Sequence, residues 1–344
     1  MTAKKTLVAL GLALAAGLAA VAPAQAADAP APAPLKIEVN TGYADDLYDY
    51  NGTIVVPTVY VKFLVEGKVF ISKQGSALQA MASGGNANSV KASARYKLEG
   101  FDKALAQSIA KQAQDDFVKR MREAGFTVLT YDDIKDRELM KDVARVEAKD
   151  MDATWGLPTE SAPGSSDTYV VAAPSDAQQF KIGFTGPYAE FMKRGKSRFE
   201  DAVVMIPTYT IVAPQVWGQA DSGYNRISAA INTAPGMNLQ YASATWLGKP
   251  HVRMGGKVTG VVTKTYTTNI TEKAGEMVKT EETTPKAANA ISKGLSFLTG
   301  AGSIQASSAN YVLKVDQAAY AAGALNGIGA FNAEVGKYAA TAKK

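Results

Sequence analysis

The chain has 344 residues, with 37 Lys and Arg against 32 Asp and Glu, one histidine and no cysteine. The absence of cysteine excludes a disulfide scaffold, a lipid-anchored lipoprotein, thiol catalysis and cysteine-ligated metals, and a single histidine excludes zinc held by several histidines. The length is sufficient for one large domain or two ordinary ones.

Residues 1–26 have the pattern of a secretory signal peptide. Two lysines precede an apolar run from Leu7 to Val21, and Ala24-Gln25-Ala26 supplies a small-x-small cleavage site. A membrane anchor is the alternative, for which the run is rather short. Cleavage would remove two basic residues and leave 35 against 32 acidic ones, or +3. So small a charge gives no argument for nucleic acid as a partner, and we expect export to the periplasm, the outer membrane or the extracellular space.

The next part of the chain reads as a spacer followed by the start of a sheet. Residues 27–52 are a Pro/Ala-rich spacer and a turn. We expect a strand at Thr53–Val65, whose internal proline predicts an edge position or a bulge. A partner strand is predicted at Lys68–Ser72 beyond a turn at Glu66-Gly67, and a further strand at Arg95–Leu98.

Residues 100–146 predict a helix, a short strand and a second helix, the centre of an α/β module over residues 53–155. The first helix has apolar residues mostly four apart, which places them on one face: Leu105, Ile109, Ala113, Phe117 and Met121. Gly125 can end it, and Phe126–Leu129 is of strand type. Either Asp132 or Asp133 can cap a second helix containing Leu139, Met140 and Val143.

Residues 156–167 read as a linker or long loop, and residues 168–344 as a strand-rich half closed by a helix. Whether 53–155 and 168–344 form one continuous domain is left open. The expected elements are strands at Thr168–Ala173, Val203–Val212, Val252–Ile270 and Tyr311–Asp316, then a helix at Gln317–Ala340. The predicted fold class is α/β (α+β), a mixed β-sheet covered by amphipathic helices, with an extended strand-rich C-terminal half.

Two segments that share a Pro-Thr pair suggest either a duplicated sheet element or chance. Met205-Ile206-Pro207-Thr208-Tyr209 echoes Val55-Val56-Pro57-Thr58-Val59.

Four cations between two phenylalanines are the candidate binding residues. Lys193, Arg194, Lys196 and Arg198 surround a glycine between Phe191 and Phe199. They are an expected anion-binding site for phosphates or a polyanion, with a solvated turn as the alternative.

No complete catalytic motif is present, and we expect no enzyme, cofactor or metal. Ser108 and Lys111 have the Ser-x-x-Lys spacing but lack its companion motifs. The lone His251 lies in a turn before a strand. The adjacent acids Asp115-Asp116 and Asp132-Asp133 leave a carboxylate-based reaction open, because the fold alone decides which carboxylates meet.

The central unit resembles a known periplasmic module. Leu105 to Met121, then Ala124-Gly125-Phe126-Thr127-Val128-Leu129, then Asp132 to Val146 are similar to the module shared by the curli-secretion protein CsgG and the TolB amino-terminal domain. The resemblance covers about 45 residues. It implies a non-enzymatic α/β domain of the periplasm or outer membrane, often in oligomers that assist secretion or envelope assembly. The missing lipid-bearing cysteine departs from the secretion-channel members, and no functional residues transfer.

From these observations we expect an exported, non-catalytic cell-envelope protein, an accessory factor in secretion or in outer-membrane or surface assembly. Its expected partners are envelope proteins or further copies of itself, with contact to the outer membrane. The alternative is a periplasmic binding protein for an apolar or anionic small ligand, held in a cleft near residues 156–167. A carboxylate-based hydrolase is the third hypothesis.

Overall fold

A computed structural model describes residues 38–40, 52–74, 89–161, 165–183, 186–193, 196–199, 202–223, 226–247, 257–261, 270, 273–282, 303–306 and 308–342. All of them belong to one compact unit, Leu35–Lys344. The predicted signal peptide and most of the spacer lie outside the described residues.

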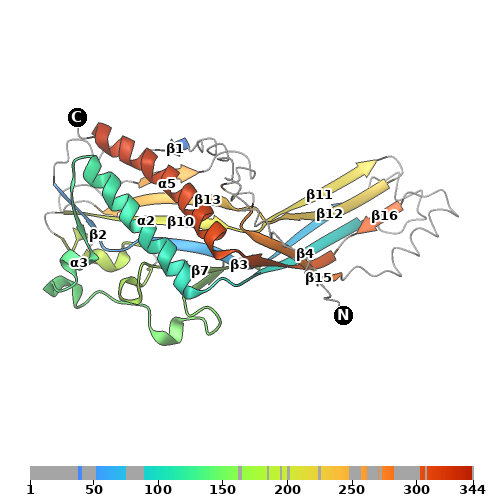
Figure 1. Cartoon of the computed structure of the whole chain (residues 1–344), viewed down its shortest axis with the longest axis horizontal. Coiled ribbons are helices and arrows are strands. Elements are labelled where there is room, and N and C mark those ends of the chain that lie inside the picture. Colours follow the sequence, from blue (N-terminus) through green and yellow to red (C-terminus); the bar gives the residue numbers. More distant parts are fainter. Residues whose placement is uncertain are drawn as a thin grey trace, which may run out of the picture. The chain divides into compact units, whose positions relative to one another are not determined.

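A mixed sheet forms the centre of this unit, and two long helices cover one of its faces (Figure 1). The strand order is β1-β14-β13-β10-β3-β4-β17-β15, that is Glu38–Asn40, Lys257–Val261, Asn238–Leu247, Ala202–Val212, Tyr60–Gln74, Ser89–Glu99, Ser308–Val315 and Gly275–Glu282. Beside this path, β2 (Thr53–Val56) pairs with β10 and β5 (Thr127–Thr130), and β7 (Thr168–Ala172) pairs with β3 and β6 (Thr159–Ser161). The predicted α/β class with a mixed, helix-covered sheet is confirmed. Strands from both sides of residues 156–167 share this sheet.

The two long helices form where the apolar periodicity predicts them. Helix α2 spans Lys103–Glu123, and the carboxylate of Asp102 caps it by accepting from the Leu105 N–H at 2.8 Å. Helix α5 spans Gln317–Ala342. The apolar stripe expected on α2 is buried against the sheet, in the helix-side cluster that also holds residues of α5 such as Phe331 and strand residues such as Phe63. Within the described ranges, no helix combines the length and apolar character that crossing a membrane requires.

A buried chain of hydrogen bonds joins both helices to the sheet. The Tyr209 hydroxyl of β10 donates to Asn332 Oδ1 of α5 at 2.6 Å, and Asn332 Nδ2 donates to Asp116 Oδ2 of α2 at 2.9 Å. Burial foremost, and then the charge of Asp116, raises the pKa of Tyr209, so the phenol stays neutral and remains a donor.

The sheet contains two similar units, each a pair of antiparallel strands followed by a helix. They are β3-β4-α2 and β15-β17-α5, and β4 and β17 are parallel neighbours. Both helices therefore begin at the same end of the sheet, where Gln317 Nε2 donates to the Gly100 carbonyl at 2.9 Å and to the Asp102 carboxylate at 3.2 Å.

The predicted turn at Glu66-Gly67 and the hairpin built on it are wrong. Strand β3 runs without interruption from Tyr60 to Gln74; it is antiparallel to β7 in its first half and, from Glu66 onward, to β4. Gly67 is part of the ladder because a Cβ there would lie 2.2 Å from the hydroxyl of Tyr96, the residue paired with it. The glycine makes room for a cross-strand ring, not for a turn.

The interruption lies instead at residues 57–59, which separate β2 from β3, so the single strand predicted at Thr53–Val65 is in fact two. Val55 pairs with Val204 and Tyr60 with Thr208, so four residues of the chain face three on β10, and the one extra residue makes this break resemble a bulge. Pro207 falls in the stretch of β10 that has no partner in β2 or β3, and on its other side it pairs with Ala244 of β13. The two Pro-Thr segments thus lie on neighbouring parallel strands.

Two glutamines replace the hydrogen bonds that are lost at this bulge. Gln114 Nε2 of α2 donates to the Val56 carbonyl at 3.2 Å, and Gln178 Nε2 donates to the Pro57 carbonyl at 3.1 Å. Gln178 Nε2 also donates to Gln114 Oε1 at 3.1 Å. Each glutamine is buried, so the network satisfies carbonyls that would otherwise be unpaired away from water.

The predicted second helix over residues 132–146 is wrong in extent. Helix α3 covers only Tyr131–Ile134, and a single 3-10 turn covers Glu138–Met140. Ile134, Met140 and Val143 all belong to a second apolar cluster on the opposite face of the sheet. Positions 134 and 143 would point to opposite sides of an α-helix at about 100° per residue, so only a broken chain buries both.

Beyond the helix-covered part, β3 and β4 are covered by a second sheet (Figure 1). It consists of β11 (Gln215–Gly223), β12 (Arg226–Ala234) and β16 (Ser303–Ala306). Among the residues whose burial the structure describes, Ala92, Ala94, Ala229 and Ile231 are buried in this interface. Of the predicted strand at Val252–Ile270, the structure describes β14 and Ile270, and the remainder lies outside the described residues.

Candidate functional site

A cleft of about 470 Å³ lies where the two strand-pair units meet. Its lining residues come from four neighbouring strands and from the segment that precedes β7: Glu66, Gly67 and Lys68 of β3; Arg95, Tyr96 and Lys97 of β4; Asn310 and Tyr311 of β17; Thr280 of β15; and Ser166. The volume falls in the range of roughly 300–1,000 Å³ that small-molecule sites occupy.

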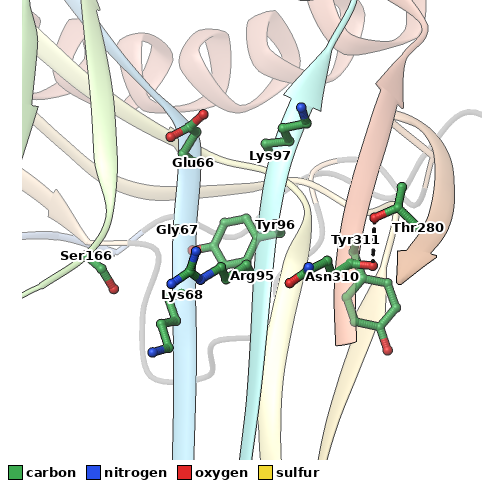
Figure 2. Close-up of a pocket in the computed structure, with 10 residues that line it drawn as sticks. All are labelled: Glu66, Gly67, Lys68, Arg95, Tyr96, Lys97, Ser166, Thr280, Asn310 and Tyr311. Atoms are coloured by element: carbon green, nitrogen blue, oxygen red, sulfur yellow. Dashed lines mark hydrogen bonds between the residues drawn. The ribbon is translucent and has the colours of Figure 1, made fainter. Parts of the chain in front are cut away.

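A row of polar side chains crosses the cleft at one height of the sheet (Figure 2). Lys68 is paired with Arg95 across β3 and β4, and Arg95 is paired with Asn310 across β4 and β17. On β15, the residue paired with Asn310 is Glu281, and the neighbouring Thr280 lies at a shift in register, where its hydroxyl donates to the Asn310 carbonyl at 3.3 Å. Residues from three distant parts of the sequence therefore present their side chains to one small region.

The row places two positive charges directly opposite each other. Lys68 and Arg95 are both exposed, and neither forms an ion pair within the described part of the chain. Like charges at directly opposed positions of an antiparallel pair destabilise the sheet. Sheet stability alone therefore gives no reason for this pair, whereas an anionic ligand would turn the repulsion into attraction.

One step along the strands, Glu66 is paired with Lys97, so the second row is close to neutral. The two rows together carry three cations and one carboxylate, a net charge of +2 by direct count. Successive side chains of a strand point to opposite faces, so Glu66 and Lys68 share one face with Lys97 and Arg95.

Two of the lining residues, Gly67 and Tyr96, alternate with Lys68 and Arg95 along β3 and β4, so their side-chain positions belong to the opposite face of these strands. The Tyr96 ring covers Gly67, and its hydroxyl donates to Asp167 Oδ1 at 3.1 Å. Burial, followed by the charge of Asp167, raises the pKa of Tyr96, so the phenol remains a neutral donor. This hydrogen bond joins β4 to the segment before β7 at the height of Lys68 and Arg95.

The predicted anion-binding residues are located in a small hairpin outside the cleft lining. Lys193 is paired with Lys196 between β8 (Met192–Lys193) and β9 (Lys196–Ser197), and Arg194 lies outside the described residues. The Arg198 N–H donates to the Phe191 carbonyl at 2.9 Å. Both flanking phenylalanines, Phe191 and Phe199, are buried in the opposite-face cluster, so they anchor the hairpin.

The residues considered for catalysis have structural partners where they are described. Lys111 Nζ is paired with Asp115 at 3.0 Å, and Ser108 Oγ accepts from Gln112 at 3.3 Å, so serine and lysine do not form a hydrogen-bonded pair. Asp116 binds Asn332 as described above. His251 lies outside the described residues.

The second acidic pair stabilises the start of α3. Asp133 accepts from the N–H of Thr130 at 2.7 Å and from its hydroxyl at 2.9 Å. These hydrogen bonds to Thr130 lower the pKa of Asp133. Asp132 is paired with Lys135 at 3.0 Å.

The cleft residues were not singled out by the sequence analysis, because they are ordinary charged residues on separate strands. A usable signal was present in Lys68 and Arg95, each of which alternates with buried residues in a strand pattern. Only the pairing of β3 with β4 shows that they are neighbours. Comparisons of the chain with protein-family models, with curated proteins and with solved structures found no match. The resemblance to the CsgG and TolB module therefore stays a prediction.

Proposed function

We propose that the chain is an exported, non-catalytic protein of the cell envelope that binds a small anionic ligand in the cleft between its two strand-pair units. The observation that carries this proposal is the opposed pair Lys68 and Arg95, which has no acidic partner within the described residues. The pattern of residues 1–26 supports export.

The position of the cleft agrees with this function. It spans β3, β4, β17 and β15, so a bound ligand would contact both units. Ser166 also lines it, next to the Asp167 that holds Tyr96. The site thus lies beside the 156–167 segment, near which the sequence analysis expects a ligand cleft.

The experiment is a thermal melt of the purified protein with a panel of small anionic and apolar compounds, combined with fractionation of the source cells. A ligand that binds only the folded state, at about 100 times its Kd, adds roughly 2.7 kcal/mol and raises the melting temperature by several degrees. We expect anionic members of the panel to do so. Recovery of the protein from the cytoplasm, or an unchanged melt with every anionic compound at millimolar concentration, would contradict the proposal.

A second candidate function is that of an accessory factor in secretion or in outer-membrane or surface assembly. The observation that favours it is the exposure of two large aromatic residues, Phe70 at 56% on β3 and Trp217 at 49% on β11. Both lie in the part of the two sheets that the helices do not cover. Exposed aromatics are common at protein interfaces, and the partner would be an envelope protein or another copy of the chain.

Light scattering after gentle extraction separates these two functions. A large assembly in the membrane fraction supports the accessory role, and a soluble monomer supports the binding protein.

A further inference from the structure

We infer that the anionic group held in this cleft is a phosphate dianion, as inorganic phosphate or as the headgroup of a phosphate monoester, bound between Lys68 and Arg95. This inference rests on the proposed binding function and specifies the chemical class of the ligand.

The charge of the cleft matches a dianion better than a carboxylate. The lining residues Lys68, Arg95 and Lys97 stand against one carboxylate, Glu66, so the lining has a net charge of +2. A phosphate monoester carries about −1.5 to −2 at neutral pH, whereas a carboxylate carries one charge. A single carboxylate would leave a net charge of +1 on the lining.

The geometry of the row also suits a tetrahedral oxyanion. Adjacent strands lie about 4.8 Å apart, so the side chains of Lys68 and Arg95 emerge close enough to contact one group. Arginine offers a planar fork of N–H donors that binds two phosphate oxygens at once, and lysine adds a compact charge. On the far side of Arg95, Asn310 supplies an uncharged polar side chain.

Glu66 limits what else the ligand can carry. Its carboxylate lies one pairing step from the cationic row, on the same face. A second phosphate near it would be repelled, whereas a hydroxyl on the body of the ligand would find an acceptor. The cleft is therefore suited to a single phosphate on a neutral, hydroxyl-bearing body, and it disfavours a polyphosphate.

The test is isothermal titration of the purified protein with inorganic phosphate and with glycerol 3-phosphate, a soluble monoester, at constant ionic strength. The variants are Lys68→Gln and Arg95→Gln. The matched control is Lys91→Gln, because Lys91 is an exposed cation on the same strand and the same face, about 13 Å from Arg95. All three variants lose one positive charge, so general attraction falls equally in each.

We expect Lys68→Gln and Arg95→Gln to weaken phosphate binding about tenfold or more, the worth of a hydrogen bond to a charged group. The Lys91→Gln control should stay within about twofold of the unmodified protein, as expected for an exposed charge more than a Debye length away. Without phosphate, Arg95→Gln should melt no lower than the unmodified protein, because the substitution removes a repulsion.

Equal weakening in all three variants would overturn the inference, since it would show attraction to overall charge only. Absence of binding to either phosphate compound would also overturn it. In that case a carboxylate that still raises the melting temperature, and does so less in Arg95→Gln, would leave the proposed binding function standing.

A parallel measurement identifies the source of the phosphate. Vesicles of phosphatidylcholine with phosphatidic acid carry the same monoester on a lipid, and vesicles of phosphatidylcholine alone are the control. Sedimentation with the first kind only, reduced in Arg95→Gln and not in Lys91→Gln, assigns the site to a lipid headgroup. Phosphate binding in titration without sedimentation assigns it to a soluble phosphate, and sedimentation that is equal in both variants counts against the cleft as the site.

Discussion

Two glycines of helix α5 offer a matched test of how closely this helix packs. Gly327 and Gly329 lie in the same helix, so replacing either by alanine gains the same intrinsic helix stability, roughly 1 kcal/mol. Their surroundings differ. A Cβ at Gly327 would lie 2.9 Å from Ile270 Cδ1 and 3.3 Å from Leu239 Cβ, whereas a Cβ at Gly329 meets nothing nearer than Asp116 Oδ2 at 3.9 Å.

The cost at Gly327 comes from forcing an extra carbon into a filled core. Ile270 and Leu239 are both buried, and the Cβ of Leu239 can move only if strand β13 moves with it. Overpacking of this kind costs about 1–3 kcal/mol. The gain in helix propensity offsets part of this cost, so Gly327→Ala should lower the free energy of unfolding by between zero and about 2 kcal/mol. Gly329→Ala should raise it by about 0.5–1 kcal/mol.

Urea unfolding followed by circular dichroism measures both variants against the unmodified protein. We expect the urea midpoint of Gly329→Ala to rise and that of Gly327→Ala to fall or stay unchanged. The free energies of unfolding of the two variants should differ by about 1–3 kcal/mol. Propensity cancels in that difference, which therefore reports packing alone. A Gly327→Ala variant that is as stable as Gly329→Ala would refute the close contact of α5 with Ile270 and β13.

Two further predictions concern the bulge and the start of α3. Gln178→Ala should destabilise the protein by about 1–3 kcal/mol, because it leaves the buried Pro57 carbonyl without its donor and removes a partner of Gln114; urea unfolding measures this, and an unchanged midpoint would argue against the network. The lowered pKa of Asp133 means that its capping contribution is fully present above the ordinary pKa of 3.8 and is lost as the pH falls through the still lower folded value. Stability measured from pH 5 to pH 2 should therefore fall less steeply in Asp133→Asn than in the unmodified protein, and parallel curves would show that the hydrogen bonds to Thr130 do not form in solution.

The parts of the fold that the sequence predicts well are those set by local periodicity. Helices α2 and α5 follow from apolar residues recurring three and four apart, and β10 follows from its β-branched and apolar residues, four of which are consecutive from Val203 to Ile206. The end of α2 follows from Gly125, whose φ of +90° is a conformation that other residues rarely adopt.

The parts that the sequence misses depend on contacts between distant segments. Gly67 has the same local signature whether it turns the chain or makes room for Tyr96. The residues after Ile134 include enough apolar positions to predict a helix. Ile134, Met140 and Val143 are instead buried in one cluster on the sheet, and an α-helix could not bury positions 134 and 143 together. In both cases the partner lies elsewhere in the chain, so local pattern alone cannot distinguish the outcomes.

The candidate site illustrates the same limit. The four cations of residues 193–198 are close together in the sequence, so the sequence pattern alone indicates them. Lys68, Arg95 and Asn310 are far apart along the chain and become neighbours only through the strand order β3-β4-β17. A search for charges that are close along the chain finds mainly clusters in turns, where water solvates the charges. Sheet pairing creates the opposed charges that a ligand would neutralise.

The most direct test of the central claim is the location of a bound dianion in crystals of the protein. Tungstate is a tetrahedral dianion like phosphate, and its anomalous scattering identifies its position without ambiguity. The structure predicts tungstate between the side chains of Lys68 and Arg95. Tungstate bound at the β8-β9 hairpin, with none in the cleft, would contradict the account.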